Sequence, residues 1–422
     1  MLISYVWPEP QSSAAGLRDL HLIEALSRAG YRVVIASAAQ NKAGKDSCEY
    51  WASTRENLQV HPILLNHSSF DAWISELKPD LVIFDRFVTE EQFGWRVRQA
   101  YPKAVTILDT QDLHFLRASR EEALRHEINA GRWERVVAGT PADWERDLVC
   151  RELAAIYRVD LAWLVSDFER QLLVDEFHLE SRRLFVSRFA YPKRTWLDSA
   201  ALEDFGARSG FVQLGNFRHP PNLDAFRWMR QQVWPRIRQL LPRAELHVFG
   251  AYPTQEVMEA NDPRVGFRVH GPAPELSGVF EGRRVSLAPL RFGAGIKGKI
   301  SDSWWHGVPV VSTSIGVEGM GSPKEWGGLI ADDVESFAQS CVKLHESPSD
   351  WAQLRANAGR ILDDQLSEQR FFTDLVQSVA LAEESHRQSS RDWVRNMLNH
   401  STLDAYRYFG KWLELKGDRR EP

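Results

Sequence analysis

The sequence contains little of what marks small secreted domains, metal centres or membrane proteins. Among its 422 residues are only three cysteines, Cys48, Cys150 and Cys341, which lie far apart and lack the spacing of metal ligands. A disulfide framework or a zinc site is therefore not expected, and a reducing compartment fits this usage. No run of about 18 apolar residues occurs, so we expect no membrane-spanning helix. The opening MLISYVWPEP has no charged leader and too short an apolar run for a signal peptide.

A strong charge of one sign is also absent. With 52 lysines and arginines against 57 aspartates and glutamates, the formal net charge is −5. Such a chain has no bulk attraction to nucleic acid, so we expect no nucleic-acid partner. The cysteine usage and the absence of a leader or spanning segment lead us to expect a cytoplasmic protein. Tryptophan is abundant, with 16 residues, which indicates large apolar contact surfaces without naming a ligand.

Strand-like and helix-like segments alternate along the chain. The strand-like runs of the first half are MLISYVW, YRVVIAS, DLVIFD, AVTILD, DLAWLVS and RLFVSRF. A second series begins near residue 210 with GFVQLGN, AELHVFGA, RVGFRVHG, RVSLAPL, VPVVSTS and GGLIAD. This alternation predicts an α/β fold of two doubly wound, Rossmann-like domains with parallel sheets. We place the domains at residues 1–205 and 206–380, followed by a helical extension at 381–422.

The loop after RVSLAPL, RFGAGIKG, places small residues before Lys297 and Lys299. In folds of this kind ligands bind beyond the carboxyl ends of the strands, here in the cleft between the two domains. Backbone amides at Gly293, Ala294 and Gly295 can approach an anion, and the dipole of the following helix adds positive potential. The loop therefore predicts a phosphate site with Lys297 as a partner of the phosphate oxygens. The alternative is a tight turn with solvated lysines.

The wider segment PLRFGAGIKGKISDSWWHGVPVVSTSIGVEGM resembles the donor-binding segment of family 4 glycosyltransferases, which have the two-domain GT-B architecture. Weaker similarity covers roughly residues 1–380, including FVQLGNFRHPPNLDAFRWM, LDTQDLHFLRASR and the opening PEPQSSAAGLRDLHLIEAL. The resemblance implies a retaining glycosyltransferase of the hexosyl or deoxyhexosyl type. Such an enzyme would move a sugar from a nucleoside-diphosphate sugar to a glycan, lipid-linked or other acceptor, in bacterial polysaccharide or glycoconjugate assembly.

The resemblance also implies roles for donor-binding residues. Asp302 would hold the ribose hydroxyls, where the family usually has the longer Glu, and Ala294 stands where a second Glu often contacts the sugar. Arg218 matches a diphosphate-binding arginine, and its guanidinium suits phosphate. Lys297 would supply the charge of a lysine that is missing after Arg218. The other positions assigned to the donor site are Gly16, Gly295, Ile296 and Val269.

These assignments have structural alternatives, which the sequence leaves open. Asp302 lies three residues after Lys299 and could pair with it on one helix face. Arg218 could be an exposed turn residue, and Gly16 could serve only a positive φ.

The segment LDTQDLHFLR supplies candidates from the N-terminal domain. We assign Asp112 and His114, together with Arg218 and Lys297, to the catalytic group, with His114 contacting the donor sugar or backing the reaction centre. The alternatives are a helix cap for Asp112 and a structural role for His114.

Other charged residues of the N-terminal half receive lesser roles. On the helix after His114, Arg117 and Arg120 are expected only to solvate that helix. The segment FDRFVTEEQFGWR follows the preceding strand and supplies acceptor-side candidates, namely Asp85, Arg86 and Glu91.

The chemistry follows from the kind of site. No DxD-like acidic pair lies at a convincing strand end, since ADDVE and LDDQ look helical and solvated. We therefore expect no metal site and no cofactor. Arg218, Lys297, the loop amides and the helix dipole would stabilise the charge that develops on the departing diphosphate.

The C-terminal segment 391–422 is helical and aromatic. An apolar stripe is expected from Trp393, Met397, Tyr406, Phe409, Trp412 and Leu413. Because the last helices of the GT-B architecture cross back onto the N-terminal domain, the stripe is expected to be buried there. The alternative is contact with a partner or with the inner face of a membrane, since basic residues flank the aromatic ones.

Two other functions stay open. A GT-B nucleotide-sugar epimerase would release a free nucleoside diphosphate and need no acceptor. A sugar-nucleotide-binding protein without transfer activity is suggested by Ala294 and by the replacement of Glu by Asp302.

Overall fold

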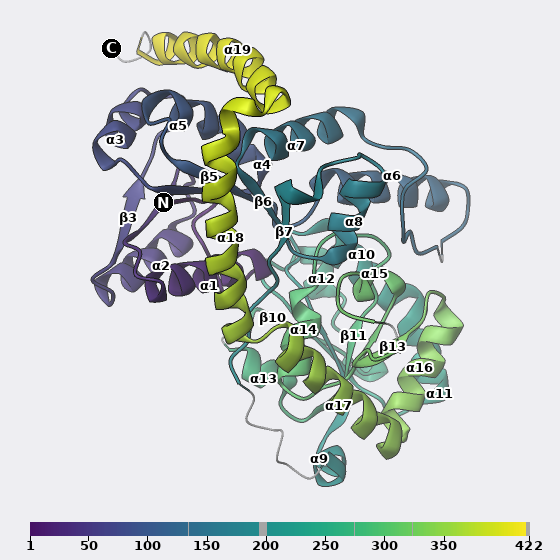
Figure 1. The fold of residues 1–422 in the computed structure, drawn as a ribbon. Helices are drawn as coiled ribbons and strands as arrows, with labels where there is room; N and C mark the ends of the chain where they lie inside the picture. The colour runs from purple at the N-terminus through teal and green to yellow at the C-terminus, as the bar shows by residue number, and fades with distance from the viewer. Residues whose placement is uncertain (134, 194–200, 274, 323, 419–422) are drawn as a thin grey trace.

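The computed structural model describes residues 1–133, 135–193, 201–273, 275–322 and 324–418. Within these residues the chain forms two α/β halves, each built on a sheet in which all paired strands are parallel (Figure 1). Helices cover both faces, which buries every residue of strands such as Val33–Ser37 and Leu81–Asp85 and explains their apolar composition. The predicted fold class, two doubly wound domains, is confirmed.

The N-terminal half contains a seven-stranded sheet. In spatial order its strands are β3 (Leu58–Pro62), β2 (Val33–Ser37), β1 (Leu2–Ile3), β4 (Leu81–Asp85), β5 (Val105–Asp109), β6 (Leu161–Leu164) and β7 (Leu184–Val186). Its α-helices are α1 (Ala14–Arg28), α2 (Lys42–Ser53), α3 (Ser69–Leu77), α4 (Arg86–Thr89), α5 (Trp95–Ala100), α6 (His114–Asn129), α7 (Arg146–Arg158) and α8 (Asp167–Asp175). A π-helical turn, η1 (Glu90–Gly94), joins α4 to α5.

The C-terminal half contains a six-stranded sheet. In spatial order its strands are β10 (Phe267–Gly271), β9 (Leu246–Phe249), β8 (Ser209–Leu214), β11 (Arg283–Ala288), β12 (Val310–Ser312) and β13 (Gly328–Ile330). Its α-helices are α9 (Ala201–Ala207), α10 (Pro220–Trp228), α11 (Trp234–Leu240), α12 (Gln255–Glu259), α13 (Leu276–Phe280), α14 (Gly298–Trp305), α15 (Ser314–Val317), α16 (Val334–Glu346) and α17 (Pro348–Gln365). The strand order reverses between β8 and β11, so the loops after these two strands open the position where such folds bind ligands.

The chain crosses between the halves twice, and the two crossings pair with each other. The amide of Tyr191 donates to the carbonyl of Leu366 at 2.7 Å, and the amide of Glu368 donates to the carbonyl of Tyr191 at 3.2 Å. Phe205 of α9 packs against Trp351 of α17, with ring centroids 5.7 Å apart, so the C-terminal half includes residues before the predicted boundary at 206. The return crossing lies at 366–368, ahead of the predicted boundary at 380.

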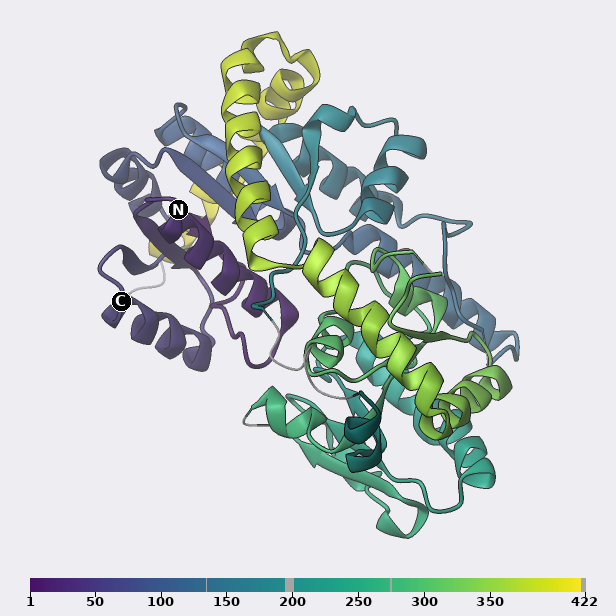
Figure 2. The same ribbon diagram turned by 60° about the horizontal axis from the view of Figure 1, so that its bottom comes forward.

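Two long helices return to the N-terminal half, α18 (Glu368–Gln388) and α19 (Trp393–Asp418). Figures 1 and 2 show α18 lying along this half, while α17 stays on the other side of the crossing. The return agrees with the expectation from the GT-B architecture. Within the described part of the chain, no helix has both the length and the apolarity needed to cross a membrane.

The predicted burial of the α19 stripe is wrong for most of its members. Trp393, Met397, Phe409 and Trp412 are 74, 60, 56 and 52% exposed. The side chain of Tyr406 lies outside the described residues. Polar and charged contacts attach α19 instead, among them Arg395 to the buried Asp160 and Glu414 to the hydroxyl of Ser68 at 2.6 Å.

Candidate functional site

Loops from the two halves touch where the strands of each sheet end. A side chain added at Gly295, in the loop after β11, would approach within 2.8 Å of Cβ of Asp112, in the loop after β5. One added at Gly298 would approach within 2.9 Å of Cβ of Ala14, at the start of α1. The two glycines therefore allow the domains to approach closely at the glycine-rich loop.

The two lysines of this loop turn into the protein. Lys297 precedes α14 and is 7% exposed, and its ammonium donates to the carbonyl of Gly295 at 2.7 Å. The ammonium of Lys299 donates to the side-chain oxygen of Asn222, on α10. Burial lowers the pKa of Lys297 to about 8 and that of Lys299 to about 7. The alternative of solvated lysines is therefore wrong.

The glycine-rich loop binds an anion that belongs to the protein. The amide of Gly295 donates to Oε1 of Glu169, on α8 of the other half, at 2.8 Å, and the amide of Leu113 donates to the same oxygen at 3.0 Å. Glu169 is 1% exposed, and burial raises the pKa of its carboxyl to about 7. The sequence predicted an anion at these amides but did not predict Glu169. Its only local signal is the capping of α8, where its amide donates to Ser166.

A buried arginine holds the same loop from its other side. Arg120 of α6 donates to the carbonyl of Gly293 at 2.6 Å and makes two hydrogen bonds, of 2.7 and 2.8 Å, to the carboxylate of Glu318. The side chain of Arg120 is fully buried, so the expectation that it solvates its helix is wrong. Its charge is tolerated in the interior because Glu318 pairs with it bidentately.

Asp302, predicted as the ribose ligand, lies on α14 one turn after Lys299. The hydroxyl of Tyr191 donates to its Oδ1 at 2.7 Å. Burial raises the pKa of Asp302 to about 7, against the opposing effects of Tyr191 and of the charge on Lys299. In the described part of the chain, Asp302 hydrogen-bonds to Tyr191 and Lys299 to Asn222. The alternative, a direct pair between Asp302 and Lys299, is therefore not formed.

Arg218 lies in the turn between β8 and α10 and is exposed. Its guanidinium carbon lies 3.6 Å from the ring centroid of Tyr252. Tyr252 in turn donates to Oε2 of Glu9, in the loop after β1, at 2.5 Å. Arg218 is thus a turn residue, as its alternative stated, but the stacked tyrosine and a carboxylate of the other half hold its orientation.

His219, next to Arg218, was missed by the sequence reasoning. Although the residue is exposed at the surface, desolvation by the surrounding protein lowers its pKa to about 3, and the charges that act on it come from Arg117, Asp112, Lys299 and Arg86. The imidazole is therefore neutral at pH 7 and lies where cationic groups of both halves converge. Its position directly after Arg218 and before the Pro-Pro that opens α10 was the signal available in the sequence.

The predicted pair Asp112 and His114 lies together at the start of α6. Although burial opposes it, an ion pair with Arg117 holds the pKa of Asp112 well below its usual range. Nδ1 of His114 lies 3.6 Å from Asp112 and 3.5 Å from Glu152 of α7. Glu152 caps α6 by accepting the amides of residues 114 and 115 at 3.2 and 3.0 Å, so Asp112 is not the cap that the alternative supposed.

Of the three acceptor-side candidates, two lie near the group around His219. Arg86 follows β4 with φ of 69°, in the left-handed region that side chains rarely adopt. Its guanidinium lies 3.4 Å from Asp85, which is 1% exposed. The structure does not bring Glu91 to this group, because Glu91 pairs with Arg151 of α7 at 2.6 Å.

Three further predicted residues do not present side chains to the site. The space in front of Gly16 is filled by the backbone of Glu9, 2.5 Å from an added Cβ, and Gly16 is helical without a positive φ. Ile296 is 8% exposed and packs in the apolar cluster that joins the halves. Val269 lies within β10, where it packs on the C-terminal core and its amide donates to Asn261.

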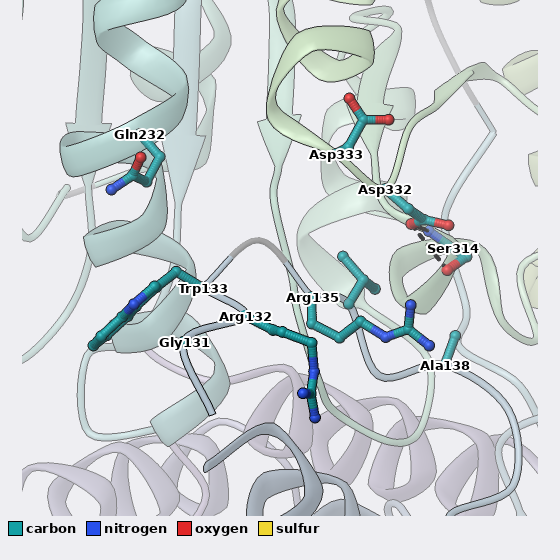
Figure 3. A pocket seen from close by; sticks show the side chains of 10 residues that line it. Gly131, Arg132, Trp133, Arg135, Ala138, Gln232, Ser314, Asp332 and Asp333 are labelled. Carbon is teal, nitrogen blue, oxygen red and sulfur yellow. Dashed lines mark hydrogen bonds between the residues drawn. The ribbon is translucent and has the colours of Figure 1, made fainter. Parts of the chain in front are cut away.

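A cavity of about 750 Å³ is lined by the loop after α6 of the N-terminal half and by residues of the C-terminal half (Figure 3). Its walls come from the loop after α6 and from the ends of β12 and β13, and Arg135 extends toward the wall formed by Ser314 and Asp332. Arg291, which precedes the glycine-rich loop, donates to the carbonyl of Trp133 at 2.7 Å and so ties this wall to the loop. None of the predicted site residues lines the cavity. We place the site at the glycine-rich loop because the buried charges of both halves meet there.

The fold is that of known glycosyltransferases. The chain is similar to HepE of Anabaena, solved in complex with UDP, at 11% identity and a TM-score of 0.66. The alignment covers 90% of this chain and 99% of HepE. It is also similar to sucrose-phosphate synthase of Thermosynechococcus elongatus, at 14% identity, 90 and 98% coverage and a TM-score of 0.63. WaaG, a glycosyltransferase of lipopolysaccharide biosynthesis, aligns at 10% identity, 86 and 96% coverage and a TM-score of 0.57. The chain therefore has a GT-B fold.

Similarity in sequence to known proteins covers only part of the chain. Residues 208–347 match the family described as glycosyl transferases group 1. An uncharacterized 44.6 kDa protein from the cps region of Klebsiella pneumoniae is 25% identical over 169 residues, which make up 38% of this chain and 44% of that protein. The match thus spans less than half the length of that relative. Lys297, Lys299 and Asp302 lie within the residues that match this family model.

Proposed function

We propose that the protein is a retaining, family 4 type glycosyltransferase that moves a sugar from a nucleoside-diphosphate sugar to a glycan or lipid-linked acceptor. The observation that carries the proposal is the pair of inward-turned lysines at the start of α14, Lys297 buried and Lys299 half-buried, within the residues that match the glycosyl transferases group 1 model. Two lysines held at the positive end of a helix dipole favour a multiply charged anion between them. A nucleoside diphosphate is such an anion.

In this proposal the protein supplies the charges that a leaving diphosphate needs. Lys297 turns from the carbonyl of Gly295 to the phosphate, Lys299 and Arg218 contact the remaining oxygens, and Asp302 accepts the ribose hydroxyls. His114, held between Asp112 and Glu152, lies on the side of the sugar. The reaction requires no metal, because cationic side chains neutralise the leaving group.

The comparisons support the finer parts of the proposal. HepE was solved with UDP and with UDP-glucose, which favours a uridine diphosphate hexose as the donor. The relative from a cps region favours a role in surface polysaccharide or glycoconjugate assembly.

The surface of α19 supports contact with the inner face of a membrane as part of this function. Trp393, Met397 and Trp412 are exposed, and Lys416 lies 4.8 Å from the ring centroid of Trp412. Exposed tryptophans with adjacent lysines are typical of helices that lie in a membrane interface. Sedimentation with anionic vesicles tests this contact, and Trp412→Ala is expected to reduce binding.

The proposal is tested by nucleotide binding followed by a transfer assay. We expect one of UDP, GDP, CDP, dTDP and ADP to raise the melting temperature of wild type, and the shift to be lost in Lys297→Ala. The sugar form of that nucleotide should then label a glycan acceptor. Failure of all five nucleotides at millimolar concentration contradicts the proposal. Release of free nucleoside diphosphate without an acceptor indicates an epimerase, and binding without turnover indicates a protein that has lost transfer.

A further inference from the structure

The hydroxyl of Tyr191 hydrogen-bonds to the carboxylate of Asp302, the residue that we propose binds the ribose. It donates to Oδ1 of Asp302 at 2.7 Å, while in the described part of the chain the second carboxylate oxygen has no hydrogen-bond partner. Asp302 is partly exposed, so a ligand can reach this second oxygen. A carboxylate with one oxygen bound and one open can accept one further pair of hydroxyl hydrogens.

Tyr191 is held rigidly because it lies where the two crossings of the chain pair. Its amide and its carbonyl both hydrogen-bond to the returning segment, at Leu366 and Glu368. Its ring is 7% exposed and belongs to the apolar cluster that contains Ile300 and Trp304 of α14. The hydroxyl is therefore a fixed reference point against which the side chain of Asp302 is oriented.

The hydroxyl also stays a donor over the whole working pH range. Burial, followed by the charge of Asp302, raises the pKa of Tyr191 well above its usual value. The phenol therefore keeps its proton, and Asp302 at 2.7 Å is a closer acceptor for it than the carbonyl of Gly298 at 3.4 Å. An aspartate has one methylene less than glutamate, so its oxygens reach less far, and orienting the side chain matters more than it would for a longer one.

We propose that Tyr191 is a positioning residue of the donor site, which fixes Asp302 so that its open oxygen accepts a ribose hydroxyl and thereby selects ribonucleotides. This inference rests on the proposed function, because it assumes that a nucleoside diphosphate binds at α14. Removal of the phenolic hydroxyl should weaken the recognition of the ribose and leave the recognition of the phosphates unchanged.

The test compares ribonucleotides with their deoxy forms. Calorimetric titration of wild type and Tyr191→Phe with UDP, 2′-deoxy-UDP and 3′-deoxy-UDP measures the contribution of each hydroxyl. A hydrogen bond to a carboxylate predicts that wild type binds UDP at least about tenfold more tightly than one of the deoxy forms. In Tyr191→Phe this preference should fall to about threefold or less, while the affinity for the discriminated deoxy form changes less than about twofold. Tyr157→Phe, at a tyrosine of α7 remote from the site, is the matched control and should keep the wild-type preference.

Each other outcome overturns the inference in a recognisable way. If Tyr191→Phe weakens the ribo and deoxy forms equally, the tyrosine is structural. If its preference equals that of wild type, Asp302 does not depend on the hydroxyl. If wild type binds UDP without any preference over its deoxy forms, the ribose role of Asp302 is wrong while the diphosphate site stands. If none of UDP, GDP, CDP, dTDP and ADP binds to wild type, the proposed function itself fails.

Discussion

Replacement of Lys297 by methionine should stabilise the protein and strongly weaken its affinity for nucleotide. Burial lowers the pKa of this lysine from 10.5 to about 8. At about 1.4 kcal/mol per pKa unit, the charged lysine costs the folded state about 3 kcal/mol below pH 8. Methionine removes this cost but leaves the carbonyl of Gly295 without its donor, which costs about 1–2 kcal/mol. We expect the free energy of unfolding at pH 7 to rise by about 1–2 kcal/mol.

The pH dependence of this gain is a signature of the buried charge. A lysine with a lowered folded-state pKa destabilises fully below that pKa, and the penalty disappears as the pH rises to the unfolded value. The gain in Lys297→Met should therefore shrink between pH 8 and about pH 10.5. In the same variant, the affinity for UDP should fall about 30-fold or more at pH 7, because a charge-assisted contact to phosphate is lost.

Urea unfolding and calorimetric titration of the same samples measure both effects. Lys103→Met, at an exposed lysine of the N-terminal half, is the control and should change stability by less than about 0.5 kcal/mol. A variant of Lys297 that unfolds more easily and still binds UDP like wild type would show that the lysine is a structural tie of the loop. The placement of the phosphate site would then be refuted.

Three further predictions concern other buried charges. Burial lowers the pKa of Lys299 to about 7, so UDP binding must take up a proton above this pH. The dissociation constant for UDP should therefore rise by up to about tenfold per pH unit above 7. A dissociation constant that stays the same between pH 6.5 and 8.5 would contradict this. Burial raises the pKa of Glu169 to about 7, so Glu169→Gln should gain stability over wild type as the pH rises from about 4.5 to above 7 and show no gain at pH 4, measured by urea unfolding. Arg120→Met leaves Glu318 without its partner and should cost about 3–5 kcal/mol of unfolding free energy, and Arg120→Met combined with Glu318→Gln should recover part of it if the ion pair is the cause.

The fold and the location of the glycine-rich loop follow from local patterns in the sequence. Apolar β-branched runs that alternate with helical segments favour parallel sheets covered on both faces, and each predicted run contains a strand. The edge strand β3, which is only partly buried, was not predicted. Small residues followed by Lys297 predicted a strand-to-helix turn, and α14 begins directly after this lysine. Asp302 was assigned through the resemblance to family 4 glycosyltransferases, and only its place one helical turn after Lys299 follows from the spacing in the sequence.

What only the tertiary structure decided is which charged side chains are buried and which anion occupies the loop. Glu169 and Arg120 look like ordinary surface residues of amphipathic helices, because the Gly295 amide and the Glu318 carboxylate that they bind lie 126 and 198 residues away in the chain. His219 likewise becomes part of the site through groups of the other half. The exposed aromatic face of α19 was predicted to be buried, because the last helices of the GT-B architecture cross back onto the N-terminal domain. Local periodicity reports which residues share a face of a helix, whereas the partner of that face depends on how the two domains and the returning helices dock.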